Sequence, residues 1–298
     1  KGIKQIASFS SKIVPLMGII YIILGLYIII VNYNTPILTQ QCINSIFKYT
    51  SGISFEVILI DNASSDESRI IFSNDSRIIY QYETINHGFG KANNIASQRA
   101  RGKYLFFLNS DTVLLNNAVL ELYSYYENHE QDNIGVIGGY LLDNDRNQIH
   151  SGGPFPFFKT VIKPILGLGS SHQIDYVTGA DMFLPVTLYK EVGMFDEDFF
   201  MYYEETYMQY LISKLSYKNI LVKGPRIIHL EGQSQHKHSN KKRIQINRSL
   251  FIFWRKIYSP YRVVLYKLVF IFIKFGVFFR RNYSFGENVK FIASLIKN

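Results

Sequence analysis

Short apolar runs that end at polar residues recur along the first half of the chain. They predict strands near residues 27–32, 55–60, 77–82, 103–108 and 134–139. Between these runs, apolar residues at helical spacing predict helices near 36–49, 66–73, 89–100 and 116–129. Alternating strands and helices are typical of a mostly parallel central sheet with helices on both faces. The sequence therefore predicts an α/β fold.

Polar side chains follow three of the predicted strands. These residues are Asn32 and Asn34, then Asp61, then Asn109 and Asp111. Because open α/β folds bind ligands at the carboxyl edge of the sheet, we expect the five side chains to lie near one another at a ligand site. Taken singly, each of them is equally well explained as a turn former or helix cap.

The second half of the chain is less regular. Residues 142–173 are rich in glycine and proline and predict a long loop region. A helix is predicted over 203–217, followed by short strands over 219–222 and 226–228 that lead to His229.

Several short motifs occur along the chain in a fixed order. They are Val31-Asn-Tyr-Asn34, Asp61-Asn-Ala-Ser64, Asn86-x-Gly-Phe-x-x-Ala-Asn-Asn94, Leu108-Asn-Ser-Asp111-Thr112, Thr178-Gly-Ala-Asp-Met182, Phe195-Asp-Glu with Tyr203-Glu204-Glu205, and His229. The series resembles glycosyltransferase family 2, with the bacterial rhamnosyltransferase-like proteins as the most similar group, over roughly residues 27 to 235. The resemblance implies a GT-A type nucleotide-diphospho-sugar transferase fold.

The resemblance also implies an activity. The expected reaction moves a sugar from a dTDP- or UDP-linked donor to a hydroxyl of a glycan or lipid-linked acceptor, with inversion, in bacterial surface polysaccharide synthesis. Asp61 resembles the family carboxylate that accepts a hydrogen bond from the base, and Lys91 or Arg99 is a candidate partner for phosphate. The donor-binding residues implied are Asn32, Asn34, Asp61, Asn86, Lys91, Asn94, Asn109 and Asp111.

A divalent metal ion is the implied cofactor, because the leaving diphosphate gathers negative charge as the glycosidic bond breaks. Mg²⁺ or Mn²⁺ would take Asp111 as a carboxylate ligand, with His229 as a further ligand if the ion is Mn²⁺. The family pattern often has an acidic pair here, whereas this chain has Asn109 and Ser110 before Asp111. This departure puts the affinity for metal in question.

Glu205 is the candidate general base by its position in the family pattern, and Glu204 would support it. The family usually has Asp where this chain has Glu205, and often another Asp where it has Tyr207. The resemblance implies acceptor-binding roles for Asp181 and Tyr207. Acidic residues also stabilise helix starts, so a purely structural role for the glutamate pair is an alternative.

Composition and charge narrow the setting. The chain has 298 residues, 47% of them hydrophobic, and a single cysteine, Cys42, which excludes an internal disulfide and fits a reducing compartment. The net charge of +9 indicates an anionic partner. Basic and aromatic residues concentrate in residues 237–298, which predicts a membrane-associating tail.

Within this tail, Lys267, Lys274 and Arg281 are spaced by seven residues and would line one side of amphipathic helices on an anionic leaflet. A helical hairpin packed on the catalytic domain is the alternative. Nucleic-acid binding is disfavoured, because the segment is strongly aliphatic and carries no nucleic-acid-binding motif.

The amino-terminal segment is apolar from Ile13 to Val31. Because the resemblance assigns Tyr27 to Val31 to the first strand, about fourteen apolar residues remain, too few for a comfortable membrane span. We therefore expect an apolar extension over 1–26, a catalytic domain over 27–236 and the tail over 237–298, in a cytoplasmic protein peripheral to the inner face of the cell membrane. The oligomeric state is not predicted.

Two alternatives to an active transferase exist. A catalytically weak or inactive family member that only binds sugar nucleotide would explain the departures at Glu205 and Tyr207. A dinucleotide-binding oxidoreductase would use Gly88-Phe-Gly90, but the third glycine of that fingerprint is Asn93 here, and the first strand-to-helix turn has no glycine.

Overall fold

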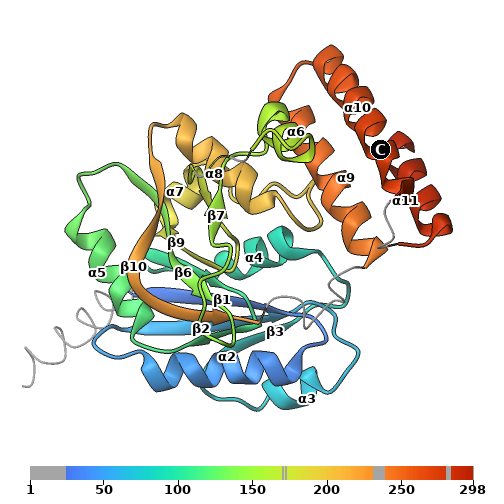
Figure 1. The fold of residues 1–298 in the computed structure, drawn as a ribbon. Helices are drawn as coiled ribbons and strands as arrows, with labels where there is room; N and C mark the ends of the chain where they lie inside the picture. The colour runs from blue at the N-terminus through green and yellow to red at the C-terminus, as the bar shows by residue number, and fades with distance from the viewer. Residues whose placement is uncertain (1–24, 170, 172, 231–238, 280–282, 298) are drawn as a thin grey trace, which may run out of the picture.

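The computed structural model describes residues 25–169, 171, 173–230, 239–279 and 283–297. Most of the predicted amino-terminal extension, residues 1–24, lies outside the described residues. A large central sheet dominates the described part of the chain (Figure 1). Its eight strands have the order β3-β2-β1-β4-β9-β6-β10-β5. They are β1 (Leu26–Asn32), β2 (Phe55–Asp61), β3 (Ile78–Tyr82), β4 (Tyr104–Leu108), β5 (Thr112–Leu114), β6 (Ile134–Leu142), β9 (Asp181–Pro185) and β10 (Lys218–His229).

The sheet is mostly parallel, as predicted. Strands β3, β2, β1 and β4 run parallel, and β6 pairs in parallel with β10. Strand β9 lies between β4 and β6 and is antiparallel to both, and β5 is antiparallel to β10. A separate small ribbon pairs β7 (Gly152–Gly153) with β8 (Tyr176–Val177). The five strands predicted in the first half of the chain are all confirmed.

Helices cover both faces of the sheet, so alternate strand residues enter two different cores. Ile28 and Ile30 pack in the core under α2 and α5, whereas Ile29 packs in the core under α4, α7 and α8. These helices are α2 (Pro36–Tyr49), α5 (Ala118–Asn128), α4 (Phe89–Ser97), α7 (Val186–Glu191) and α8 (Glu204–Lys214), and the short α3 (Ser68–Phe72) accompanies α2.

Two parts of the second half differ from the prediction. The region expected to be a loop over 142–173 contains the helix α6 (Phe158–Ile165), which has Pro164 near its end. The two short strands expected before His229 form one strand, β10, with a register shift between Val222 and Arg226. Pro225 lies in this shift, and a proline cannot donate a ladder hydrogen bond, which made the strand look interrupted.

The carboxyl-terminal helices form a third layer on the outer side of α8 (Figure 1). They are α9 (Asn240–Ile257), α10 (Pro260–Lys274), the 3-10 turn η1 (Phe275–Phe279) and α11 (Phe285–Lys297). Trp254 of α9 is fully buried among aromatic rings of α6 and α10, and its indole N–H donates to the Pro156 carbonyl oxygen. None of the helices described in the structure combines the length and hydropathy of a membrane-spanning segment.

Candidate active site

A cavity of about 240 Å³ lies at the carboxyl edge of the sheet, next to the start of α8. Five residues selected from the sequence line it together: Asn109, Asp111, Glu204, Glu205 and His229. The remaining lining comes from Phe89, His150, Thr178, Gly179, Ala180, Met201, Tyr202 and Lys242. Of these, Phe89 and Thr178 to Ala180 belong to motifs of the family pattern and Lys242 belongs to the basic tail, whereas nothing in the sequence distinguished His150.

Asp111 and His229 meet because of strand pairing. The antiparallel register of β5 and β10 sets His229 opposite Thr112, and the Leu230 N–H donates to the Asp111 carbonyl oxygen at 2.8 Å. The side chains then approach to 3.2 Å, between His229 Nε2 and Asp111 Oδ1. Two residues that are far apart in the sequence thus offer an oxygen and a nitrogen to the same small space.

Helix α2 supports the loop that carries these residues. The buried thiol of Cys42 donates to the Asn109 carbonyl oxygen at 3.6 Å, and the Thr112 hydroxyl donates to the same oxygen at 2.8 Å. Ser45 Oγ accepts the N–H of Leu114 at 3.0 Å. These contacts with α2 therefore fix the position of the loop that contains Asn109 and Asp111.

The donor set suits a hard divalent cation. Asp111 supplies a carboxylate, His229 a ring nitrogen, and the buried Asn109 Oδ1 has no hydrogen-bond partner among the described residues. In the described part of the chain, no three or more His, Cys, Asp or Glu side chains are arranged so that together they could hold a metal ion. A Mg²⁺ or Mn²⁺ ion held by one or two protein ligands usually completes its shell with substrate phosphate oxygens and water, so these residues fit such an ion.

The two glutamates stand on an unusual backbone. Tyr202 and Tyr203, immediately before α8, both have left-handed conformations, with φ of 69° and 70°. Such conformations cost about 1–3 kcal/mol each for residues other than glycine and concentrate at functional sites. The turn places Glu204 and Glu205 at the first turn of α8, with both side chains lining the cavity.

Burial changes the acidity of the pair. Desolvation raises the pKa of Glu204 well above its usual value, with a further increase from the neighbouring Glu205 charge. Desolvation also raises the pKa of Glu205, opposed by hydrogen bonds that include one from the Thr206 hydroxyl at 3.1 Å. The buried Glu204 Oε2 has no hydrogen-bond partner among the described residues. The environment therefore favours a protonated Glu204 and leaves Glu205 as the better proton acceptor.

The residues selected at the ends of β1 and β2 form a neighbouring polar cluster outside the cavity lining. Asn32 and Asp61 are register partners and both are fully buried. Asp61 Oδ1 accepts the Ser64 N–H at 3.0 Å, and Oδ2 accepts the Tyr80 hydroxyl at 2.8 Å. Asn32 Nδ2 and the Asn34 N–H both donate to Ser64 Oγ. Asn32 thus supports the turn, and donor binding by Asn32 and base recognition by Asp61 both stay predictions.

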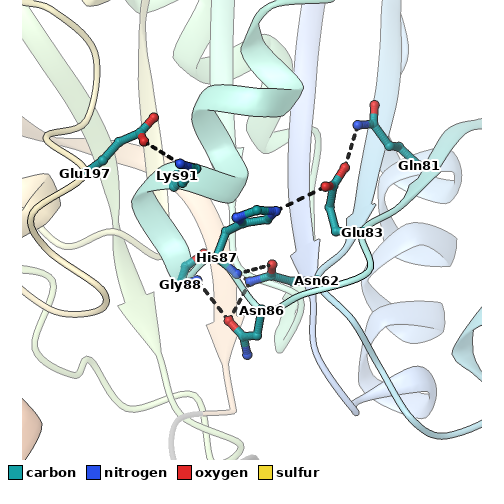
Figure 2. A network of polar contacts seen from close by, with 8 residues as sticks. All are labelled: Asn62, Gln81, Glu83, Asn86, His87, Gly88, Lys91 and Glu197. Atoms are coloured by element: carbon teal, nitrogen blue, oxygen red, sulfur yellow. Dashed lines mark hydrogen bonds and ion pairs between the residues drawn. The ribbon is translucent and has the colours of Figure 1, made fainter.

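Asn62 holds the loop of residues 86–88 in place (Figure 2). Its Nδ2 donates to Asn86 Oδ1 and to the Gly88 carbonyl oxygen, both at 3.0 Å, and its Oδ1 accepts the His87 N–H at 2.9 Å. Asn86 Oδ1 also accepts the Gly88 N–H. Asn62 was not among the predicted site residues, although it belongs to the Asp61-Asn-Ala-Ser64 motif and directly follows a strand-ending aspartate.

Gly88 joins this loop to the segment before α8. Its φ is +80°, and a Cβ atom at this position would lie 2.0 Å from the Phe200 carbonyl oxygen. The same oxygen accepts the Phe89 N–H at 2.9 Å. Glycine is therefore required by both conformation and space, which accounts for it without a dinucleotide. The loop that contains Asn86 and the segment leading to Glu204 share one backbone contact.

The polar network continues on either side of the loop (Figure 2). His87 Nε2 lies 3.2 Å from Glu83 Oε2, and Gln81 donates to the other Glu83 oxygen at 2.6 Å. Lys91 pairs with Glu197 at 2.8 Å in an exposed ion pair. Phosphate binding by Lys91 stays a prediction, since its ammonium group lies outside the cavity lining.

Asn94 has a structural role, and its expected role in donor binding stays a prediction. Its Oδ1 accepts the Tyr189 hydroxyl at 2.6 Å and the Phe195 N–H at 3.1 Å. Its Nδ2 donates to the Phe195 carbonyl oxygen and to Glu197 Oε1. With both ends of its amide engaged and the residue buried, Asn94 ties α4 to the loop before α8.

Asp181 and Tyr207 also lie outside the cavity lining, and their expected acceptor-binding roles stay predictions. Asp181 is fully buried at the start of β9, and its Oδ2 accepts the Gly139 N–H at 2.6 Å from β6. Tyr207 lies on the side of α8 that packs against α9, with its ring 6.1 Å from that of Phe253. Both side chains face packed neighbours, and neither lines the cavity.

We expect Asp181→Asn to be more stable than the wild type at about pH 8 by more than about 1 kcal/mol, because a pKa difference of one unit between the folded and unfolded states corresponds to roughly that free energy and an amide has no proton to lose. Burial raises the pKa of Asp181 well above its usual value, and Oδ1 has no partner among the described residues. A raised folded-state pKa gives stability that is complete below the unfolded pKa and is lost as the pH rises through the folded pKa. Urea denaturation between about pH 5 and pH 8 should show this loss in the wild type and not in Asp181→Asn. Identical pH dependence would contradict the assignment.

The protein has a fold of the GT-A type. Similar solved structures include "GalNAc-T7 with UDP, GalNAc and Mn2+", with a TM-score of 0.62 and 15% identity over 92% of this chain and 55% of that one. The mannosyltransferase PcManGT from Pyrobaculum calidifontis, solved with GDP-Man and Mn²⁺, has a TM-score of 0.56 and 14% identity over 91% of this chain and 74% of that one. At such identities the likeness concerns the fold alone.

Residues 27–181, just over half of the chain, match the family model described as Glycosyl transferase family 2. The chain therefore belongs to glycosyltransferase family 2, which removes the oxidoreductase alternative. It is 30% identical to the low-salt glycan biosynthesis hexosyltransferase Agl10 of Haloferax volcanii, over 60% of this chain and 59% of that protein. It is 24% identical to the poly(ribitol-phosphate) beta-N-acetylglucosaminyltransferase TarS of Staphylococcus aureus, over 58% of this chain and 29% of that protein. The chain thus spans less than two thirds of the length of these relatives.

Proposed function

We propose that the protein transfers a sugar from a dTDP- or UDP-linked donor to a hydroxyl of a glycan or lipid-linked acceptor, with inversion at the anomeric carbon. The observation that carries this proposal is the convergence of four residues on one cavity: Asp111 and His229 at the sheet edge, and the buried pair Glu204 and Glu205. Such a cavity combines ligands for a diphosphate-bound cation with a carboxylate of raised pKa, the two elements that glycosyl transfer requires.

Glu205 acts as the general base in this proposal. It takes the proton of the acceptor hydroxyl as that oxygen bonds to the anomeric carbon, and the bond from this carbon to the diphosphate oxygen breaks with its electron pair leaving on the diphosphate. Glu204, whose pKa is raised more strongly, stays protonated and spares the cavity a second negative charge. The close backbone contact between Gly88 and Phe200 holds the segment before α8 against the loop of residues 86–88.

Asp111 and His229 would hold Mg²⁺ or Mn²⁺ in this reaction, with Asn109 Oδ1 as the adjoining polar group. The ion supplies electrostatic stabilisation for the charge that develops on the leaving diphosphate. Mn²⁺ is the ion named with the two similar solved structures, and imidazole ligation by His229 suits it better than Mg²⁺.

The setting proposed is bacterial surface polysaccharide synthesis on the cytoplasmic face of the cell membrane. The names of Agl10 and TarS connect those relatives with glycan biosynthesis and with poly(ribitol-phosphate) glycosylation, which supports an extended or lipid-linked glycan as acceptor. The single cysteine of this chain suits a reducing compartment.

A thermal-shift screen tests the donor class. We expect UDP or dTDP to raise the melting temperature only when Mn²⁺ is present, because a ligand that binds the folded state stabilises it in proportion to RT ln(1 + [L]/Kd). At about 100 times the dissociation constant, this amounts to roughly 2.7 kcal/mol. Mn²⁺ alone and NAD serve as controls. Stabilisation by NAD, or equal stabilisation by nucleotide without Mn²⁺, would contradict the proposal.

A further inference from the structure

The helix α10 exposes apolar side chains on the side that faces away from the protein. Phe272 is 80% exposed and Leu268 61% exposed, whereas only Val263, Phe270 and Ile271 of this helix are buried. With Tyr261, Val264 and Leu265 they follow helical spacing and form a single stripe, here called the α10 outer face. Figure 1 shows α10 on the far side of α9 from the central sheet.

The opposite side of α10 accounts for its packing. Val263, Phe270 and Ile271 are buried, and the ring of Phe270 contacts those of Phe251 and Trp254 on α9. The α10 outer face is therefore not needed for the hairpin with α9. A helix that is apolar on both sides fits a surface that is covered by another apolar phase.

The lysines of α10 point away from this face. Lys267 Nζ donates to the Ile296 carbonyl oxygen of α11 at 3.1 Å and lies 5.6 Å from the centre of the Phe251 ring. Lys274 Nζ lies 5.0 Å from the centre of the Phe270 ring. The third member of the stripe expected from the sequence, Arg281, lies outside the described residues. The membrane-facing side expected from these lysines is therefore corrected in favour of the apolar stripe.

Charge around the hairpin indicates what covers the face. Residues 237–298 contain 14 lysine and arginine residues and one acidic residue, Glu287, whereas the whole chain has a net charge of +9. The positive charge thus belongs to this segment, and the remainder of the chain has more acidic than basic residues. An apolar stripe with basic surroundings and a tyrosine at one end matches the interface of an anionic bilayer.

We propose that the α10 outer face inserts into the interfacial layer of an anionic membrane, with α10 lying in the membrane plane and the catalytic cavity opening close to the lipid headgroups. The helix α9 connects the two places. Lys242 lines the catalytic cavity, and the adjacent Arg243 lines a second cavity of about 520 Å³ together with Phe272 and Lys274. Resting on the proposed function, this arrangement selects an acceptor whose sugar is attached to a membrane lipid.

Vesicle cosedimentation of the full chain tests the insertion. The variant Leu268→Ser/Phe272→Ser should bind vesicles of equimolar phosphatidylglycerol and phosphatidylcholine roughly tenfold or more weakly than wild type, because two apolar side chains no longer leave water. The matched control is Ile37→Ser/Ile70→Ser on α2 and α3, where the isoleucines are 70% and 73% exposed on the other side of the sheet. This control should bind like wild type. Added salt and pure phosphatidylcholine should both weaken binding.

Other outcomes have defined meanings. Unchanged binding of the α10 variant would overturn the proposal, because the amino-terminal apolar segment is present in every variant and would then be the anchor. A wild type that dimerises without vesicles, and an α10 variant that is monomeric, would assign the face to a second copy of the chain and also overturn it.

Transfer assays separate this proposal from the proposed function. The α10 variant should keep wild-type transfer to a water-soluble acceptor and lose transfer to a vesicle-embedded one. If wild type transfers sugar to neither acceptor, the proposed function fails, while the vesicle-binding result still decides the insertion.

Discussion

Replacing Glu205 by glutamine is expected to lower turnover by roughly 10²–10⁴-fold while leaving donor affinity almost unchanged. Glutamine keeps the size of the side chain and can still accept the hydrogen bond from Thr206, but it cannot take a proton at neutral pH. Turnover should be measured by release of nucleoside diphosphate in the presence of acceptor, and donor affinity by calorimetry. A fall in donor affinity as large as the fall in turnover would refute the role of general base.

The matched control is Glu204→Gln. Because burial holds Glu204 in its protonated form, a neutral amide should replace it with a smaller loss of turnover. The wild-type rate should fall as the pH drops through the raised pKa of Glu205, so this limb lies at higher pH than for an ordinary glutamate. The opposite order of the two variants would make Glu204 the base. Donor binding without any transfer by the wild type would identify an inactive family member.

Replacing Asp111 by asparagine is expected to weaken Mn²⁺-dependent binding of UDP or dTDP by roughly 100-fold or more. Even the loss of a hydrogen-bond partner behind a metal ligand costs about 10–100-fold in affinity, and the Asp111 carboxylate lies 3.2 Å from His229 in the cavity. Asparagine is isosteric, so the melting temperature without ligands should stay close to that of the wild type. Titration of nucleotide at fixed Mn²⁺ measures the effect.

A charge-matched control for this variant is Asp145→Asn, on an exposed turn. It removes one exposed negative charge that does not line the cavity and should leave nucleotide binding unchanged. His229→Ala should weaken binding in Mn²⁺ more than in Mg²⁺, because only the softer ion gains from an imidazole ligand. Wild-type Mn²⁺ dependence in Asp111→Asn would mean that the cation is held elsewhere.

The sheet and its ligand edge were predictable because the signals are local. Strands such as β1 and β4 are continuous apolar runs, since both of their faces are buried, and the residues that end them necessarily share one edge. The prediction that Asp111 and His229 lie together rested on the family resemblance. Neither residue by itself indicates the antiparallel register of β5 and β10 that brings them together.

The sequence did not predict which motif residues line the cavity. A motif contains both residues that line a cavity and buried residues that hold the surrounding backbone in place. Asp181 points inward because β9 inserts antiparallel between β4 and β6, with Leu108 opposite Asp181. The side-chain amide of Asn94 is hydrogen-bonded to a loop about a hundred residues later in the sequence. Only three-dimensional packing separates these residues from Asp111. The direction of the Lys267 side chain was not predictable either, because helical spacing does not indicate which side of α10 packs against α9 and α11.

The lone cysteine gives the molecule a built-in reporter of local opening. Burial raises the pKa of the Cys42 thiol to about 12, so the native protein presents almost no thiolate to alkylating reagents at neutral pH. Labelling must wait for α2 to separate from the Asn109 loop, and its rate measures the free energy of that separation. Separation of α2 from the Asn109 loop can therefore be followed in this chain without any substitution, because Cys42 is its single cysteine.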